Sequence, residues 1–365
     1  MIRMNAFEAE PRTLRDAQEE ACRRVLNSGQ FILGPEVAAF EKQWAEYCGV
    51  PHCVGVANGM QALTLGLRAL GIGPGDEVIT TPTTAMATVM AVMESGATPV
   101  LADISLATAL LDPESAERCL TTRTKAILLV HLYGQMPGMT RWAQLCRKAG
   151  IHLLEDAAQA HGASDEGKRA GSLGSWAGYS FYPTKNFGAR GDAGAFVTSS
   201  AELAARVQRL RHYGAAQRDH HVEPGYNSRL DEMQAAILRA RLPFLDQFNQ
   251  RRREVAARYH AGIRNPNVEL LAPPASAEHH VYHLFVVRCR ERDRLARFLA
   301  DRQIETLVHY PVPAHQQPCC AKIRTDPGGL PNAEQHAREC LSLPCHPQLS
   351  DEEVDRVIAA VNEFG

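Results

Sequence analysis

The 365-residue sequence has no excess of charge of one sign, because 39 lysine and arginine side chains stand against 41 aspartate and glutamate side chains. A net charge of -2 provides no basic field for a polyanion, so nucleic acid is not an expected partner. Long hydrophobic runs are missing as well. Apolar stretches such as 126–132 are far shorter than the roughly 20 residues that a membrane span needs. We therefore expect neither a nucleic-acid-binding nor a membrane-spanning protein.

Features of exported proteins are also absent. The first residues, MIRMNAFEAEPR, become acidic and polar where a signal peptide would carry its apolar segment. Most of the ten cysteines lie singly inside apolar segments, which is typical of reduced, buried thiols rather than of a disulfide framework. These features predict a soluble, cytoplasmic protein.

Metal-ligand spacing is missing too. No two cysteines are separated by two residues, as they are in zinc ribbons and redox motifs. Several histidines and cysteines do gather near the C-terminus: His315, Cys319, Cys320, His336, Cys340, Cys345 and His346. Because their spacings match no zinc template, we expect unconnected core or surface residues and no metal, with a structural zinc site as the alternative.

The hydrophobic pattern predicts an α/β protein. At about 150 residues per domain, this length favours two domains of unequal size. In the first half, apolar strands such as 125–132 alternate with amphipathic helices such as 36–47, which is typical of a parallel sheet covered on both faces. The predicted strands of this half lie at 52–56, 77–81, 98–103, 125–132, 151–155, 178–182 and 193–198. After a helix predicted at 228–242 and another at 244–261, a smaller unit has predicted strands at 281–288 and 304–309 and helices at 292–301 and 351–363.

A helix start provides the first functional signal. The segment VANGMQAL places Gly59 and Met60 at the beginning of a helix that follows a strand. The free backbone N–H groups and the dipole of such a helix start favour a phosphate, and glycine has no Cβ to keep the phosphate away. The alternative is ordinary helix initiation with Asn58 as the cap.

Charged residues follow the ends of two further strands. In LLEDAAQAHGA, Glu155 and Asp156 end a buried strand, where a charge is costly unless it meets a partner. In SFYPTKN, Lys185 follows another strand end and lies close to the hydroxyl of Ser180. A lysine whose pKa is lowered there can form a Schiff base. Taken singly, these residues also fit a helix-capping carboxylate and a solvated lysine.

Together, the helix start, the carboxylate and the lysine are the parts that a pyridoxal phosphate (PLP) site requires. In such a site an aspartate keeps the pyridine nitrogen protonated and a lysine carries the aldehyde, while helix amides and a serine hold the phosphate. The sequence resembles the DegT-type nucleotide-sugar aminotransferases over nearly its whole length. The most specific matches are EDAAQAHGA, SFYPTKN and YNSRLDE, with further matches at GVANGMQAL, VHLYGQ and HYPVPAH.

The resemblance implies a fold and an assembly. The fold would be that of the fold-type I PLP-dependent transferases, with a mostly parallel seven-stranded sheet between helices. The implied division is a large PLP-binding domain at 1–245, with an N-terminal helical segment, and a small C-terminal α+β domain at 246–365. The assembly would be a homodimer with shared active sites.

The resemblance also implies roles for individual residues. Lys185 matches the Schiff-base lysine, and Asp156 matches the partner of the pyridinium nitrogen. The other implied cofactor contacts are Gly59, Met60 and Ser180 at the phosphate, Gln159 near the phenolic oxygen, and Asn227 at the phosphate of the neighbouring subunit's cofactor. The implied sugar-binding residues are Tyr182, His309 and Tyr310.

Two positions depart from the family pattern. Ala85 stands where many members stack an aromatic ring on the pyridine, so that role stays unassigned. Arg190 stands where an apolar residue is common, and it either binds a substrate anion or pairs with Asp192 or another carboxylate. Position 185 is a lysine and not the histidine of the sugar dehydratases in this family, which favours transamination.

The expected reaction moves an amino group from glutamate to a keto sugar carried on a nucleoside diphosphate. VHLYGQ, AQAHGA and HYPVPAH look closest to members that aminate C3 of dTDP-linked 3-keto-6-deoxyhexoses. The alternatives are C4 amination of another nucleotide sugar, an amino-cyclitol ketone, and a PLP-binding regulator without turnover.

Overall fold

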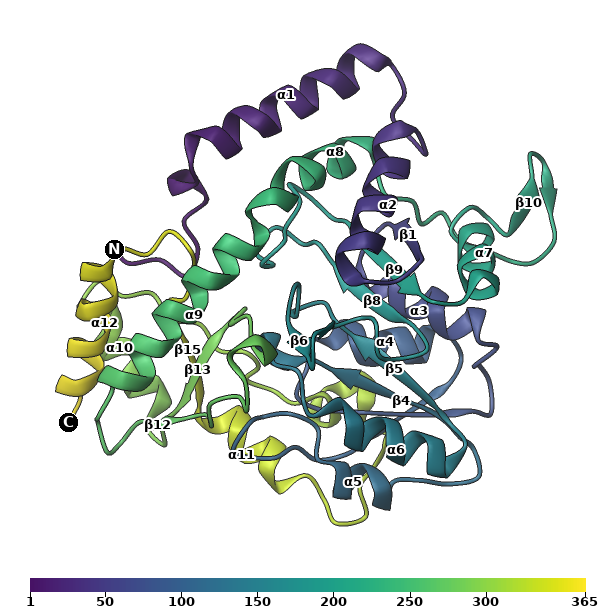
Figure 1. The fold of residues 1–365 in the computed structure, drawn as a ribbon. Coiled ribbons are helices and arrows are strands. Elements are labelled where there is room, and N and C mark those ends of the chain that lie inside the picture. The colour runs from purple at the N-terminus through teal and green to yellow at the C-terminus, as the bar shows by residue number, and fades with distance from the viewer.

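The computed structural model describes residues 1–365 and is built around one large sheet (Figure 1). Its strand order is β1-β9-β8-β5-β4-β2-β3-β14, and all neighbours from β8 to β14 are parallel, whereas β9 is antiparallel to both β8 and β1. The strands are β1 (His52–Val56), β2 (Glu77–Thr80), β3 (Thr98–Leu101), β4 (Thr124–Val130), β5 (His152–Asp156), β8 (Ala177–Ser180), β9 (Gly194–Thr198) and β14 (Arg324–Thr325). The mostly parallel α/β sheet is confirmed. The eighth strand, β14, escaped prediction because two residues carry no periodic pattern.

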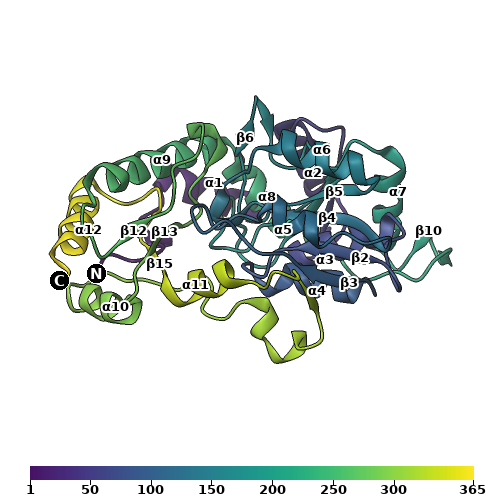
Figure 2. The same ribbon diagram turned by 90° about the horizontal axis from the view of Figure 1, so that it is seen from below.

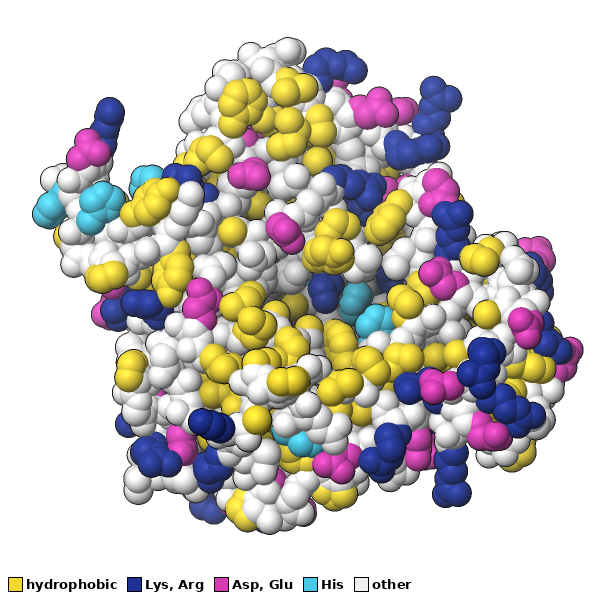
Figure 3. All heavy atoms as spheres, turned by 180° about the vertical axis from the view of Figure 1, so that it is seen from behind, with side chains coloured by type: hydrophobic (Ala, Val, Ile, Leu, Met, Phe, Trp, Pro, Cys, Tyr) yellow, Lys and Arg dark blue, Asp and Glu magenta, His cyan; other side chains and the backbone are white.

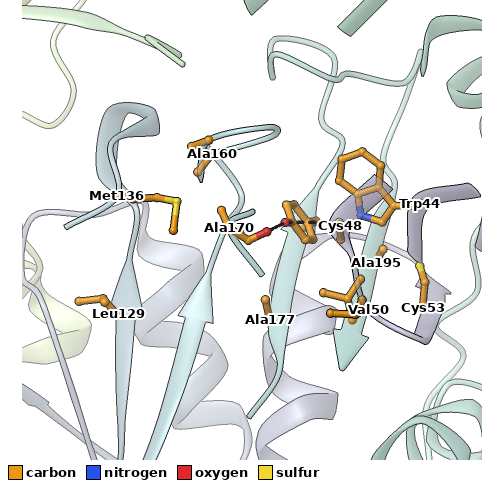
Figure 4. Close-up of a cluster of buried hydrophobic side chains, with 14 of the residues drawn as sticks. Trp44, Cys48, Val50, Cys53, Leu129, Met136, Ala160, Ala170, Ala177 and Ala195 are labelled. Carbon is orange, nitrogen blue, oxygen red and sulfur yellow. Dashed lines mark hydrogen bonds between the residues drawn. The ribbon is translucent and has the colours of Figure 1, made fainter. Parts of the chain in front are cut away.

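Helices cover both faces of the sheet (Figure 2), which explains the continuous apolar sequence of β4. Ile127 and Leu129 pack in a cluster with α2, α5 and α6, while Ala126 and Leu128 pack on the opposite face with α3, α4 and α7. Figure 4 shows part of the first cluster, with Trp44 of α2 beside the strands. The helices of this part are α1 (Arg12–Ser28), α2 (Pro35–Cys48), α3 (Gly59–Ala69), α4 (Met86–Glu94), α5 (Pro113–Arg118), α6 (Met139–Ala149), α7 (Ala201–Leu210), α8 (Glu232–Arg241) and α9 (Leu245–Gly262).

The remaining chain forms a smaller antiparallel sheet with its own apolar cluster. Its strands are β12 (Glu269–Leu270), β13 (Phe285–Arg288) and β15 (Cys340–Leu343), and its helices are α10 (Arg292–Asp301), α11 (Pro331–Glu339) and α12 (Asp351–Glu363). The cluster includes Val255 and Tyr259 of α9 and also Ile2, so the N-terminus packs beside the C-terminal elements (Figure 1). Two short hairpins complete the fold: β6 (Ser164–Asp165) with β7 (Lys168–Arg169), and β10 (Ala215–Gln217) with β11 (His220–His221). The division at 245 and 246 stays a prediction.

Three predicted elements differ from the structure. The strand predicted at 281–288 begins only at Phe285, because Tyr282 has a left-handed φ of 45° that interrupts the extended backbone. Residues 304–309 form no strand, because Ile304 and Leu307 make only isolated bridges and β15 occupies the edge of β13. The helix predicted from 228 begins only at Glu232. Ser228 is held outside the helix, since its N–H donates to the carbonyl of Arg211 and its hydroxyl accepts from the N–H of Ala57. None of the helices combines the length and apolarity that crossing a bilayer requires.

Candidate active site

A cavity of about 90 Å³ lies where the central strands of the large sheet end. This is the edge at which open parallel sheets bind ligands. Its walls come from the first turn of α3, the start of α4, the ends of β4, β5 and β8, and the loops that follow β5 and β8. The cavity brings together six of the predicted site residues: Gly59, Met60, Asp156, Gln159, Ser180 and Lys185.

The start of α3 presents free backbone donors to this cavity. Asn58 caps the helix, with its Oδ1 accepting from the N–H of Gln61 at 2.9 Å. The N–H groups of Gly59 and Met60 have no acceptor within the protein. A Cβ on Gly59 would lie 2.6 Å from the Cβ of Ser180. Glycine is therefore needed for close packing of the helix start against the end of β8, a reason that the sequence did not reveal.

Asp156 is buried at the end of β5. The hydroxyl of Thr88 donates to its Oδ2 at 2.7 Å, and the N–H of Ala158 donates to its Oδ1 at 3.2 Å. Because Thr88 gives its proton to Asp156, the 2.8 Å contact between Thr84 and Thr88 has Thr84 as the donor. Burial raises the pKa of Asp156, and the two hydrogen bonds and the nearby charge of Lys185 oppose that rise.

Lys185 lies in the loop after β8, where its backbone N–H donates to the carbonyl of Tyr182 at 2.8 Å. Its ammonium group has no hydrogen bond or ion pair in the protein. Burial lowers the pKa of Lys185 to about 8, although the carboxylate of Asp156 acts to raise it. Relative to an ordinary lysine, this raises the neutral, nucleophilic fraction at pH 7 by about two orders of magnitude.

Gln159 joins this cavity to two neighbouring segments. Its Oε1 accepts from the backbone N–H of Tyr133 at 2.6 Å, and its Nε2 donates to the hydroxyl of Tyr310 at 3.3 Å. Tyr133 and Thr88 were not among the predicted site residues. The threonine-rich TPTTAMAT segment, which runs into the first turn of α4, was the available signal for Thr88. Tyr133 lies in the family-like VHLYGQ segment without any distinguishing spacing.

The other predicted residues lie outside the wall of this cavity. His309 lines a neighbouring cavity of about 80 Å³ together with Thr184 and His283. Tyr182 and Asn227 are exposed, and the backbone of Asn227 forms an isolated bridge with that of His212 before α8 begins. The molecule is hollowed near the middle of the face in Figure 3, where basic and histidine side chains show.

Arg190 is engaged in a structural network. Its guanidinium pairs with the buried carboxylate of Glu10, and its Nε donates to the side-chain oxygen of Gln18 at 3.1 Å. Arg241 pairs with the same carboxylate at 2.8 Å. Of the two roles considered for Arg190, the structure therefore shows the ion pair, and its partner is a carboxylate other than Asp192.

No group of three or more His, Cys, Asp or Glu side chains is placed to hold a metal ion.

Comparison with known proteins assigns this arrangement to a family. Residues 12–362 match the DegT/DnrJ/EryC1/StrS aminotransferase family. The chain belongs to this family.

Two relatives and one solved structure illustrate how close this aminotransferase is to known members. The dTDP-3-amino-3,6-dideoxy-alpha-D-galactopyranose transaminase of Aneurinibacillus thermoaerophilus is 49% identical over 95% of each chain. The dTDP-3-amino-3,4,6-trideoxy-alpha-D-glucose transaminase of Streptomyces venezuelae is 48% identical over 96% of this chain and 93% of its own. The crystal structure of S. venezuelae DesV in complex with a ketimine intermediate matches with a TM-score of 0.95 and 47% identity, covering 99% of this chain and 98% of DesV. The fold-type I architecture is thereby confirmed.

Proposed function

We propose that this aminotransferase uses PLP to move an amino group from glutamate to C3 of a 3-keto-6-deoxyhexose carried on dTDP. The observation that carries the proposal is the placement of Lys185 and Asp156 in one cavity with the free amides of the α3 start. The choice of carbon and nucleotide is supported by the two relatives above, both of which are named for a dTDP-linked 3-amino sugar.

The residues of the cavity fit PLP. The unpaired N–H groups of Gly59 and Met60, with the hydroxyl of Ser180, would hold the phosphate at a helix start. Asp156 would hold the ring nitrogen, the Nε2 of Gln159 would reach the phenolic oxygen, and the small side chain of Ala85 leaves room beside the ring. Bound PLP supplies an electron sink for carbon acids next to the amine.

Lys185 and Asp156 divide the work of the reaction. Lys185 would hold the cofactor through its side-chain nitrogen and, once the donor amine has displaced it, the freed amine would take the proton from Cα of glutamate and pass it on within the cavity. Asp156 keeps the ring nitrogen protonated, and each pKa unit of that preference corresponds to about 1.4 kcal/mol. The same residues act in the reverse order when the keto sugar enters, so ping-pong kinetics are expected.

We further propose that the enzyme is a homodimer in which Asn227 reaches the phosphate of the partner's cofactor, and that Tyr182, His309 and Tyr310 line the sugar pocket. The exposure of Asn227 in a single chain supports the first assignment, and the hydrogen bond from Gln159 to Tyr310 supports the second.

All ten cysteines are free, which supports a reducing compartment such as the cytoplasm.

The test incubates purified holoenzyme with glutamate and a panel of nucleotide-linked keto sugars, and identifies the aminated carbon by NMR. We expect amination at C3 of a dTDP-linked 3-keto-6-deoxyhexose. Amination at C4, or of a cyclitol ketone, would overturn the substrate assignment. If glutamate leaves the visible absorbance of the cofactor unchanged, transamination is refuted in favour of the regulator.

A further inference from the structure

Tyr133 occupies a strained, buried position at the edge of the active site. It follows β4 in a 3-10 turn (Leu132–Gly134) and is 2% exposed. Its φ of 59° lies in the left-handed region, which is uncommon for a residue that carries a bulky side chain. Such strain persists only where surrounding contacts over-determine the conformation, and it concentrates at functional sites.

The backbone of Tyr133 faces the cofactor side of the site. Its N–H donates to Oε1 of Gln159 at 2.6 Å. With Oε1 occupied in this way, the amide of Gln159 is turned so that Nε2 donates to the hydroxyl of Tyr310. Tyr133 therefore sets which end of the Gln159 amide faces the cavity.

The hydroxyl of Tyr133 faces the other way, toward the C-terminal elements. It contacts the carbonyl oxygen of His309 and lies 2.8 Å from Nε2 of His336 in α11. A carbonyl can only accept, so the single hydroxyl proton goes to His309 and the hydroxyl accepts from His336. Burial lowers the pKa of His336 to about 3, so its ring is neutral, and the hydrogen bond to the Tyr133 hydroxyl places the single ring proton on Nε2.

The segment 307–310 has hydrogen bonds to both parts of the molecule. Leu307 exchanges two backbone hydrogen bonds with Ser342 of β15, and Nδ1 of His309 lies 2.8 Å from the Ser342 hydroxyl. Both contacts anchor the segment to the small sheet. Two further hydrogen bonds connect the segment to residues that follow strands of the large sheet. The Tyr133 hydroxyl donates to the carbonyl of His309, and Nε2 of Gln159 donates to the hydroxyl of Tyr310.

We propose that Tyr133 is a positioning residue that connects the cofactor side of the site to its substrate side. Its hydroxyl holds the 309–310 segment against Gln159, and its N–H orients the Gln159 amide. The inference rests on the proposed function, because His309 and Tyr310 are assigned to the sugar pocket there. Loosening the segment should therefore weaken sugar binding while leaving the chemistry at Lys185 and Asp156 intact.

The test compares two buried tyrosines. Tyr133→Phe removes the hydroxyl and keeps the ring and the backbone N–H. Tyr259→Phe is the matched control, because Tyr259 is also fully buried and its hydroxyl donates to the carbonyl of Pro344 at 2.7 Å, and neither residue lines the cavity of Lys185 and Asp156. In Tyr133→Phe we expect the KM for the keto sugar to rise about ten-fold, with kcat and the glutamate half-reaction changed less than about two-fold. Amide hydrogen exchange in peptides spanning 307–312 should accelerate in Tyr133→Phe alone.

Three outcomes would overturn the proposal. The first is a KM and an exchange pattern like those of Tyr259→Phe. The second is an equal loss in both half-reactions with a lowered Tm, because a purely structural residue would give that result. The third applies if the wild-type holoenzyme aminates no keto sugar, so that the proposed function has failed. Amide exchange in 307–312 that is the same in Tyr133→Phe as in wild type would then overturn the proposal. Accelerated exchange in Tyr133→Phe would still support the role of Tyr133 in holding the segment.

Discussion

Burial decides the chemistry of the two charged residues that face the cavity. It lowers the pKa of Lys185 to about 8 and raises that of Asp156, and each group partly offsets the shift of the other. A lysine is reactive when neutral, so its reactivity increases with pH up to its pKa. Near neutral pH the buried amine of Lys185 is therefore far more available than an exposed one.

This leads to a prediction about pH. The rate at which PLP attaches to the apoenzyme should rise about ten-fold per pH unit below pH 8 and level off above it, measured by stopped-flow absorbance. In Asp156→Asn the carboxylate that raises the lysine pKa is gone, so the plateau should begin at lower pH.

Lys185→Ala should show no attachment of PLP, and borohydride should fix no cofactor to this variant. Wild-type labelling of another lysine, such as Lys42 or Lys168, would refute the assignment.

Turnover should depend on the charge of Asp156, which the variant Asp156→Asn tests. The amide keeps the shape and can still accept from Thr88, but it no longer carries the charge that holds a ring proton. Transamination should fall by orders of magnitude while the Tm stays close to that of wild type. Asp192→Asn is the control, since it makes the same chemical change at an exposed aspartate that does not line the cavity. Turnover near the wild-type level in Asp156→Asn would show that the ring nitrogen has another partner.

Among secondary-structure elements, the start of α3 is the one whose position the site depends on most. A side chain at Gly59 would collide with Ser180, so the first turn of the helix would move away from the end of β8. The two predicted phosphate-binding groups, the helix amides and the Ser180 hydroxyl, would then separate.

We therefore expect Gly59→Ala to raise the Kd for PLP by at least about ten-fold, measured by fluorescence titration of the apoenzyme. Gly138→Ala is the matched control. Gly138 lies at a helix start as well, as the residue immediately before α6; it has a φ of -62°, and a Cβ there would meet no atom within 4 Å. Equal PLP affinity in the two variants would contradict a phosphate site at the start of α3.

A single chain leaves apolar side chains exposed near the end of α1 and in the segment that follows it. Leu26 is 61% exposed, and Phe31 and Ile32 lie close by in sequence with 50% and 43% of their surface exposed. In a monomer such neighbouring exposure is unfavourable, and it is typical of surfaces that associate. This exposure is consistent with the proposed dimer, in which Asn227 of each chain would complete the partner's site.

Subunit mixing tests this shared site. Lys185→Ala and Asn227→Asp should each be inactive, the second because it places a carboxylate against a phosphate. After subunit exchange, activity should return to about a quarter of wild type, because half of the protein is heterodimer and one of its two sites is intact. Mixtures that exchange fully, as shown by mass spectrometry of tagged chains, and stay inactive would contradict the model.

Local patterns in the sequence determined much of this protein. The bounds of β1, α10 and α12 match the predicted ranges, because alternation, helical periodicity and caps such as Ser350 act over a few residues. The strand-end positions of Asp156 and Lys185 were likewise readable, since parallel strands deliver their carboxyl ends to one edge. Their roles stay predictions that the experiments above address.

The contacts that join distant segments depend on how the whole chain packs and could not be predicted from local patterns. Thr88 meets Asp156 across 68 positions, and Tyr133 meets His336 across 203. β14 comes from the C-terminal third of the chain and still pairs in the large sheet. Residues 304–309 form no strand, because β15 pairs with β13 at the edge they would have occupied. Local propensity does not encode such pairings, because each depends on which segment occupies a given edge or cavity once the whole chain has packed.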